Sequence, residues 1–331
     1  MQATFLIIFT LFWSAGVLFF DGFMAHNTAK QYESGKYPAV TGTVTHSEVR
    51  THTGSKGGKS YEAVINYRFE VGGQRFAGSR LRYNQVSGGW NQANSLVAAH
   101  PTGAAVEVFY NPENPQDALL SPGVGGADFI LVLFLTPFNA IMLGFWIYLA
   151  GWLRERLYRP VAGGVQIISD GIYTRVRLPQ FGALGWGLVT TGGLSFAAVL
   201  IVGISTQMQP SIPLILTVIG AVYLSGLAVF LWQWQKLRTG IDDLVINVAG
   251  RSLDLPETFG RHERMTVSLA DIENFEVMQI EHRSSKGGIS YTYAPTLRLR
   301  GPEPGEQKLA DWSDKVKADD FAAWLRTQLG I

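Results

Sequence analysis

The sequence contains no cysteine and little charge. The absence of cysteine from 331 residues excludes disulfide bonds, thiolate metal ligands, a cysteine nucleophile and cysteine lipidation. Charged residues make up 16% of the chain, whereas soluble domains carry about 25%. The formal net charge of +1 gives no electrostatic reason to expect a nucleic-acid partner.

The sequence also lacks a recognisable catalytic or metal-binding motif. Its six histidines show no H-E-x-x-H spacing. His46, Glu48 and His52 share one face of an expected strand, but at an exposed edge such residues are more often solvated than metal-bound. Ser195, in the run GLSFA, resembles the nucleophile setting of an intramembrane serine protease, yet the expected helices hold no histidine or lysine to act as its base. We therefore predict no catalytic residue, no metal ligand, no cofactor and no enzymatic activity.

Long apolar runs are what the chain has in abundance. Hydrophobic residues make up 47% of it, and four runs are long enough to cross the roughly 30 Å hydrocarbon core of a bilayer as helices. The first run could be the apolar part of a signal peptide, but it lacks a basic segment before it and a cleavage site after it, so we expect an uncleaved helix. The four predicted spans are residues 4–23, 127–152, 184–206 and 211–234.

Basic residues predict the orientation of these helices. Arg154, Arg156 and Arg159 follow the second run, and Lys236 and Arg238 follow the fourth. Because basic flanks mark the cytoplasmic side, both clusters predict a multi-pass protein of the bacterial inner membrane whose N-terminus and C-terminus are cytoplasmic. Its first partner is then the lipid bilayer.

Residues 37–122, between the first two runs, alternate polar and apolar side chains in short stretches separated by turn signals, as in a β-domain. Three strands, a short helix over residues 89–100 and two more strands follow the order of an OB-like, partly open barrel, with an SH3-like barrel as the alternative. The stretches YPAVTGTV, VGGQRF and VFYNPENPQDALL resemble an uncharacterised family of bacterial membrane proteins in which a small β-domain lies between two transmembrane helices. The resemblance covers about the first 155 residues and implies this fold but no activity.

The cytoplasmic part is expected to be discontinuous in the sequence. Residues 161–180 contain two strand-like runs around Asp170-Gly171, a strong hairpin signal. Residues 240–331 are expected to form six strands and a C-terminal helix, and the run LVINVAGRSLDLPETFGRHERMTVSLADIENFEV resembles a bacterial pleckstrin-homology-like domain. Because an isolated hairpin is marginal in water, we predict that residues 161–180 complete this barrel.

The predicted fold class is therefore a membrane α+β protein with four transmembrane helices and two small β-barrel domains, OB-like outside and pleckstrin-homology-like inside. From Thr239 onward, 11 Lys and Arg residues face 15 Asp and Glu, a net charge of −4. Because anionic lipid repels an acidic domain, we expect protein contact in preference to lipid-headgroup binding.

Polar side chains are sparse in the predicted spans, and no ionisable residue lies at the middle of any of them. Ser14, Asn139, Ser195 and Tyr223 lie at similar expected depths and suggest a polar layer that holds the four helices together, in preference to a substrate path. Because an unpaired amide in hydrocarbon is costly, we expect Asn139 to hydrogen-bond to a side chain on the third or fourth span.

One motif, S-K-G-G-x-S-Y, occurs twice. Its copies are candidate interaction loops for a ligand or partner on opposite sides of the membrane. The plainer explanation is that the glycines supply the positive φ of a hairpin and the lysine keeps its tip soluble. The residues concerned are Ser55, Lys56, Gly57, Gly58 and Tyr61 in the first copy, and Ser285, Lys286, Gly287, Gly288 and Tyr291 in the second.

These observations together favour a non-enzymatic interaction or scaffold protein of the bacterial envelope, with an envelope protein as its partner and no nucleic acid. Two alternatives are an immunity protein that neutralises a toxin at the membrane and a membrane-bound hydrolase. A homo-oligomer is also compatible with the sequence.

The predicted orientation can be tested by labelling, since the chain has no native cysteine. A cysteine that replaces Lys56 should react with a membrane-impermeant maleimide in intact cells, because residues 37–122 are expected outside. A cysteine that replaces Lys286 should react only after the cells are opened. The opposite pattern of labelling would reverse every side assigned above.

Overall fold

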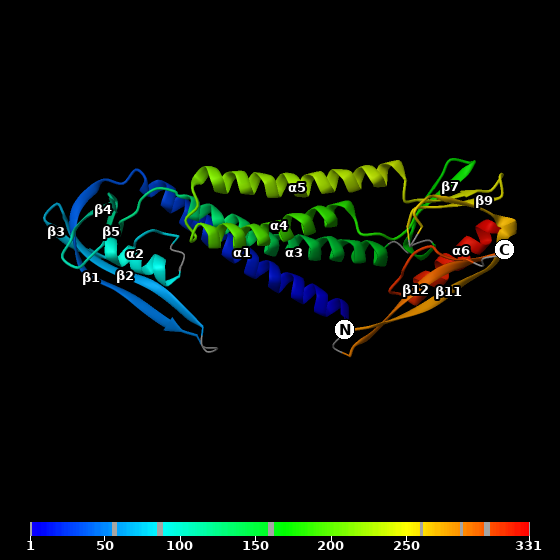
Figure 1. Cartoon of the computed structure of the whole chain (residues 1–331), viewed down its shortest axis with the longest axis horizontal. Helices are drawn as coiled ribbons and strands as arrows, with labels where there is room; N and C mark the ends of the chain where they lie inside the picture. The colour runs from blue at the N-terminus through cyan, green and yellow to red at the C-terminus, as the bar shows by residue number, and fades with distance from the viewer. Residues whose placement is uncertain are drawn as a thin grey trace. The chain divides into compact units, whose positions relative to one another are not determined.

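The computed structural model describes residues 2–54, 58–84, 89–157, 162–258, 261–284, 287–300 and 305–330. The chain divides into two compact units, Met1–Trp146 with Leu188–Gly226, and Ile147–Gly187 with Leu227–Ile331. Figure 1 traces the elements along the chain. Each unit therefore combines segments that lie far apart in the sequence.

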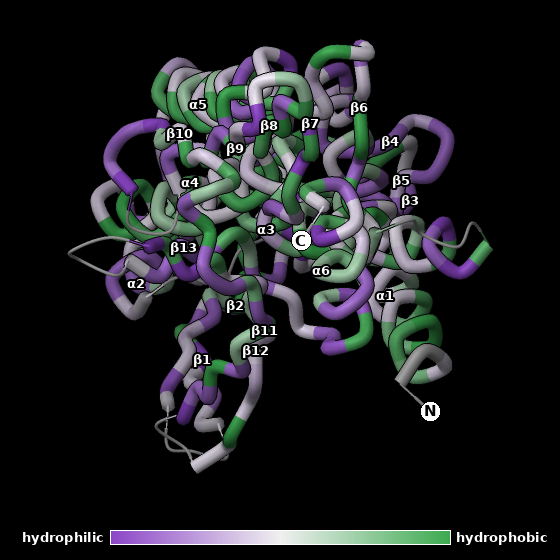
Figure 2. Tube along the Cα trace, turned by 90° about the vertical axis from the view of Figure 1, so that its right-hand side faces the viewer, coloured by the Kyte–Doolittle hydropathy of each residue, from purple (hydrophilic) through white to green (hydrophobic). Residues whose placement is uncertain are grey.

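Four long helices carry the apolar runs, and each is long and apolar enough to cross a bilayer. They are α1 (Gln2–Ser34), α3 (Gly126–Leu157), α4 (Ala183–Ser205) and α5 (Ile212–Thr239). In Figure 2 the hydrophobic colour follows α1 and α5, whereas the hydrophilic colour gathers on connecting segments and strand ends. The chain is thus a multi-pass membrane protein that needs a lipid bilayer around it.

Helix α1 continues well beyond the predicted end of its span at Phe23. Its last turns carry polar side chains that the following β-domain binds. The buried Gln31 donates from Nε2 to the carbonyl oxygens of Ser121 (2.8 Å) and Gly123 (2.7 Å), and its Oε1 accepts from Tyr83 N at 2.8 Å. The hydropathy signal ends where these contacts begin, so the predicted span 4–23 is only the apolar part of the helix.

The N-terminal β-domain is an open antiparallel sheet in the order β3-β2-β1-β4-β5. Gly72 (φ 57°) and Gly73 (φ 82°) make the tight turn between β2 and β3, where only glycine adopts these angles at little cost. Helix α2 (Trp90–Ala99) packs against β1 and β2 through the buried Ala93. The strands are β1 (Ala39–Thr53), β2 (Lys59–Val71), β3 (Gln74–Gly78), β4 (Ala105–Asn111) and β5 (Asn114–Leu119).

The partly open OB-like barrel that the sequence predicts is not found: in the described part of the chain these strands form an open sheet, and no strand ladder joins β5 to β3. Ser121 N donates to Leu81 O at 2.8 Å and so joins the segments that follow β5 and β3. Further contact comes from a side chain: the fully buried Tyr67 places its hydroxyl 3.0 Å from the carbonyl oxygens of both Arg80 and Ala118. Burial raises the pKa of Tyr67, so this hydroxyl stays protonated and able to donate.

The second unit contains a five-stranded antiparallel sheet in the order β10-β9-β8-β7-β6. Strand β7 pairs with β8, and Val176 lies opposite Leu244. The hairpin of residues 161–180, for which the sequence predicts a place in the C-terminal domain, thus shares a sheet with residues from 244 onward. The strands are β6 (Gln166–Ser169), β7 (Tyr173–Arg177), β8 (Leu244–Asn247), β9 (Ser252–Leu255) and β10 (Met265–Ser268).

Asp170 and Gly171 form the turn between β6 and β7. Asp170 Oδ1 accepts from Tyr173 N (2.7 Å) and Ile172 N (3.2 Å), and Gly171 has a φ of 90°. These backbone hydrogen bonds, that of Tyr173 first, lower the pKa of Asp170. The Asp-Gly signal read from the sequence therefore corresponds to a turn stabilised by the aspartate side chain.

A three-stranded sheet of β11 (Ile272–Arg283), β12 (Ile289–Leu299) and β13 (Glu306–Lys308) completes the second unit, together with α6 (Lys315–Leu329). Two 3-10 turns, η1 (Ala162–Gly164) and η2 (Leu269–Asp271), precede β6 and β11 respectively. Asp314 caps the start of α6, where its side chain accepts from Val316 N at 2.9 Å, and Gly330, with a φ of 69°, caps its end.

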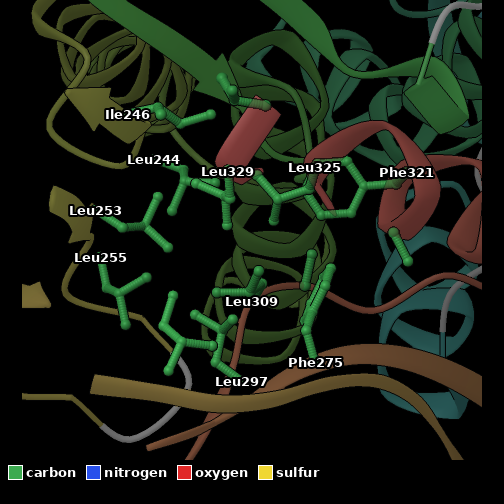
Figure 3. Close-up of a cluster of buried hydrophobic side chains, with 14 of the residues drawn as sticks. Leu244, Ile246, Leu253, Leu255, Phe275, Leu297, Leu309, Phe321, Leu325 and Leu329 are labelled. Atoms are coloured by element: carbon green, nitrogen blue, oxygen red, sulfur yellow. The ribbon is translucent and has the colours of Figure 1, made fainter. Parts of the chain in front are cut away.

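The core of this unit lies between the two sheets and α6. Figure 3 shows buried side chains of the three elements pointing toward one another: Leu244, Ile246, Leu253 and Leu255 from the larger sheet, Phe275 and Leu297 from the smaller one, and Phe321, Leu325 and Leu329 from α6. The predicted second barrel is therefore also wrong, because the described strands form two separate open sheets. Side-chain packing joins the sheets where a barrel would use a strand ladder.

Replacing Val176 by aspartate should destabilise the second unit, because Val176 is fully buried in this core. An uncompensated buried charge costs roughly 3–5 kcal/mol, so we expect a lower melting temperature and faster proteolysis after residue 240 in the full-length protein. The matched control is Ile168→Asp in the same hairpin, since Ile168 is 44% exposed and should tolerate the charge. Equal losses in the two variants would mean that the hairpin contributes nothing to the core.

Candidate functional site

Two pairs of polar side chains connect α1 to α3 at different levels along these helices. Trp146 Nε1 donates to Ser14 Oγ at 3.0 Å, and Asn139 Nδ2 donates to Asp21 Oδ1 at 3.1 Å. The two contacts are seven residues apart on each helix, which is about 10 Å along the axis. They therefore do not form the single polar layer that the sequence predicts.

The predicted partner of Asn139 is wrong. Its amide binds a carboxylate on the first span, Asp21, where the sequence predicts a side chain on the third or fourth. The sequence did not identify Asp21 as a partner of Asn139. The apolar run ends two residues after Asp21, which is typical of a charged residue at the end of a span. The continuation of α1 to Ser34 is what places Asp21 inside the helix pair.

The contact between α3 and α4 centres on Pro137, which lies inside α3. A proline has no N–H, so Pro137 leaves the carbonyl of Leu133, four residues earlier, without its usual helical donor. Ser195 Oγ of α4 donates to that carbonyl oxygen at 2.6 Å, and Ser195 is fully buried. Gly192, one turn earlier in α4, lets the helices approach: a Cβ there would lie 3.4 Å from Pro137 Cα. Ser195 thus satisfies a backbone group that would otherwise be unpaired in hydrocarbon.

Helix α5 is joined to α3 by hydroxyl groups. Tyr223 Oη and Thr136 Oγ1 lie 2.9 Å apart, and Thr136 also donates to Val132 O at 2.6 Å within its own helix. All four residues predicted for a polar layer, Ser14, Asn139, Ser195 and Tyr223, therefore lie in α3 or bind it. The arrangement is a central helix with three partners.

A groove with a volume of about 560 Å³ runs along α3 and is walled by α1, α4 and α5. Its lining is mainly apolar, with Asp21, Asn139, Thr136 and Tyr223 among its polar side chains. A carboxylate at this depth is costly in lipid, and ionisable groups within spans are generally functional or paired. In this groove the amide of Asn139 donates a hydrogen bond to the Asp21 carboxylate.

The two S-K-G-G-x-S-Y motifs lie at the ends of long antiparallel hairpins, β1 with β2 and β11 with β12. Ser55, Lys56, Gly57, Ser285 and Lys286 lie outside the described residues. The other members are described: Gly58 and Tyr61 in the first copy, and Gly287, Gly288 and Tyr291 in the second. Gly287 has a φ of 81°, as the turn explanation requires.

The similarity of the two hairpins extends beyond the motif. We call residues 50–53 with 59–62 the first arm, and residues 280–283 with 289–292 the second arm. The arms share the same register, since His52 lies opposite Ser60 and His282 opposite Ser290. Each hairpin is closed by a backbone hydrogen bond of 2.8 Å at the same place, from Gly54 N to Gly58 O in the first and from Ser284 N to Gly288 O in the second.

Each arm also has the same diagonal contact across its strands. His52 Nε2 lies 2.9 Å from Glu62 Oε2, and His282 Nε2 lies 2.9 Å from Thr292 Oγ1. In both arms the partner is ten residues after the histidine. Sequence reasoning found the loops but missed this histidine, which precedes each serine by three residues and extends the motif to H-x-x-S-K-G-G-x-S-Y.

Comparison with known proteins matches residues 40–125 to a family model described as a domain of unknown function, DUF3592. The match covers the N-terminal β-domain up to the start of α3 and confirms the predicted resemblance for this part of the chain. No curated protein and no solved structure matches the chain. The comparisons show no pleckstrin-homology-like family for residues 240–331, so that resemblance stays a prediction.

The described residues contain no group of three or more His, Asp or Glu side chains placed to hold a metal ion. His46 and Glu48 do approach each other, with Nε2 and Oε1 3.5 Å apart, but His52 pairs with Glu62. Ser195, which was considered as a catalytic nucleophile, donates its hydroxyl proton to the Leu133 carbonyl oxygen. The geometry therefore favours a structural role for Ser195 and pairing within its own hairpin for His52.

The role of Ser195 can be tested by a double-mutant cycle. Ser195→Ala should lower the free energy of unfolding in detergent by about 1–2 kcal/mol, because it leaves the Leu133 carbonyl unpaired. In a Pro137→Ala background the restored N–H can pair with that carbonyl, so Ser195→Ala should then cost markedly less. Thr190→Ala, on the same helix, serves as the control. Equal costs of Ser195→Ala in the two backgrounds would contradict this account.

Proposed function

We propose that this chain is a non-enzymatic, multi-pass interaction or scaffold protein of the bacterial inner membrane, with both termini cytoplasmic. The observation that carries the proposal is the pair of structurally equivalent arms, one in each unit. If the motif served only to form a turn, similarity between the two hairpins would be needed only at the glycines of the tip. The shared register and the shared histidine contact extend several residues beyond the tip.

The proposed orientation rests on matching features at the ends of α3 and α5. The last turns of these helices contain Arg154 and Arg156, and Lys236 and Arg238. Three of these cations lie over tryptophan rings: Arg156 over Trp152 (5.3 Å), Lys236 over Trp232 (4.8 Å) and Arg238 over Trp234 (4.9 Å). Tryptophan is enriched at both membrane interfaces, and an excess of basic side chains marks the cytoplasmic one. With four spans, the first arm is then outside and the second inside.

The arms have free backbone edges that suit pairing with another chain. Among the described residues, β1 pairs with β4 only over residues 39–43, and β2 pairs with β3 only over residues 67–71. Likewise β12 pairs with β13 only over residues 296–298. A two-stranded ribbon with both edges open is marginal in water, and an added strand from a partner would satisfy its unpaired N–H and C=O groups.

The exposed side chains of the second arm support a protein partner. Ile289 is 55% exposed and Tyr291 is 41% exposed, on an arm whose other residues are largely polar. Aromatic and aliphatic side chains are common anchors in protein interfaces. The first arm has Lys59 and Tyr61 at the equivalent positions, so the two arms share the aromatic residue and differ beside it.

Site-specific photocrosslinking in native membranes tests the proposal. A photoreactive amino acid at Lys59 or Ile289 should give discrete protein adducts, and Tyr61→Ala or Tyr291→Ala should reduce the corresponding adduct several-fold. Controls are Arg75, whose side chain is 89% exposed outside the first arm, and Val316, which is 66% exposed on α6. Adducts at twice the chain mass would identify a second copy as the partner. The same adduct pattern at the arm and control positions, or no adduct at either arm, would contradict the proposal.

A further inference from the structure

A pocket with a volume of about 420 Å³ lies where the N-terminal β-domain meets the start of α3 and the loop between α4 and α5, all within the first unit. We call it the junction pocket. A second hollow of about 270 Å³ shares Gln92 and Met208 with it and extends to Trp90. Sites for small molecules generally measure about 300–1,000 Å³, so the junction pocket is large enough for one.

The wall formed by the loop after α4 is held in a specific conformation. Gln207 (φ 51°) and Met208 (φ 62°) both adopt the left-handed region, which non-glycine residues rarely occupy twice in succession. Met208 N donates to Gly203 O at 2.8 Å. The loop also presses on the start of α3: a Cβ at Gly126 would lie 2.0 Å from the carbonyl oxygen of Pro210, so only glycine fits there.

Three polar atoms of residues that line the junction pocket are buried and have no hydrogen-bond partner among the described residues: Arg82 Nε, Asn84 Oδ1 and Gln92 Oε1. Asn84 is 5% exposed, and its other amide atom donates to Thr28 Oγ1 at 2.9 Å, which fixes the side chain in place. Buried polar atoms are normally paired, so the set indicates a ligand that offers both donors and acceptors.

The charge of the pocket excludes a strongly ionic ligand. Arg82 Nη2 binds Asp128 Oδ2 at 2.6 Å, so the guanidinium already has its counter-ion. The described lining of the pocket and of the adjoining hollow contains no further Lys, Arg, Asp or Glu. A charged group in this space would be desolvated without compensation.

The uncharged lining is rich in amides and has one exposed indole. Asn84, Gln92 and Gln209 line the junction pocket, and Asn91 and Gln207 line the hollow beside Trp90. Each amide has a donor and an acceptor in one plane, which matches neighbouring hydroxyl groups that donate and accept in turn. Trp90 is 51% exposed and offers an apolar face for C–H groups. We propose that the junction pocket binds the sugar of an uncharged carbohydrate, either free or as the headgroup of a glycolipid.

The experiment uses the full chain in phosphatidylcholine nanodiscs and consists of two measurements. In the first, saturation-transfer NMR measures binding of glucose, galactose, mannose, N-acetylglucosamine, maltose, lactose and cellobiose. In the second, the melting temperature is compared between nanodiscs with and without monoglucosyl-diacylglycerol, because a ligand of the folded state raises it. Binding in the NMR measurement indicates a free saccharide. Stabilisation by the glycolipid without binding in the NMR measurement indicates a glycolipid.

Variants on α2 separate this site from unspecific binding. Gln92→Leu and Asn91→Leu should each weaken binding about tenfold, because each removes hydrogen bonds to a neutral ligand. Asn94→Leu is the matched control, since Asn94 is exposed on the same helix and lines neither space. The proposal is overturned if no probe binds in either measurement, or if Asn94→Leu weakens binding as much as both lining variants do.

Discussion

The carbonyl oxygen of Leu133 illustrates the constraint that organises the spanning helices. A backbone oxygen without a partner is costly in hydrocarbon, and Pro137 creates one in the middle of α3. Ser195 of α4 binds it, which fixes how α4 lies along α3. Helix α3 also binds α1 through Asn139 and Trp146, and it binds α5 through Thr136. It is therefore the common partner of the other three helices. Since apolar surface alone does not drive helices together in lipid, these few hydrogen bonds and small-residue contacts select the arrangement.

The N-terminal β-domain is attached to this helix group through buried polar contacts. Gln31 near the end of α1 binds the chain around Ser121, and Arg82 of the β-domain binds Asp128 in the first turn of α3. Such contacts are directional, so they hold the domain in one orientation on the two helices that enter and leave it. The junction pocket owes its walls to this attachment, because its lining comes from the β-domain, α2, α3 and the loop after α4.

The second unit reaches a stable core by a different route. Strands β6 and β7 precede α4 in the sequence, and β8 follows α5, yet β7 and β8 are neighbours in one sheet. A membrane-inserted helical hairpin therefore interrupts a domain that must be completed from both sides of the insertion. The two arms recur on units with different sheets and different sequence neighbours, which makes their shared register and histidine contact features of the arms themselves.

The sequence by itself determined the elements that depend on local composition. Four apolar runs specify four long helices, because bilayer thickness sets the length of apolar chain that is needed. Asp170-Gly171 specifies its turn, because the side chain and the glycine act on their own backbone. The resemblance over residues 40–125 rests on the same kind of local signal.

Only the tertiary structure decided which polar groups meet and whether the sheets close. Asn139 could have paired with any neighbouring helix, and its choice of Asp21 depends on the length and packing of α1. Strand order predicted two barrels, but the described strands form open sheets: the Tyr67 hydroxyl contacts the carbonyl oxygens of Arg80 and Ala118 in one unit, and side chains of α6 pack into the core of the other. The junction pocket gives no sequence signal, since its amides come from segments whose proximity arises from long-range packing.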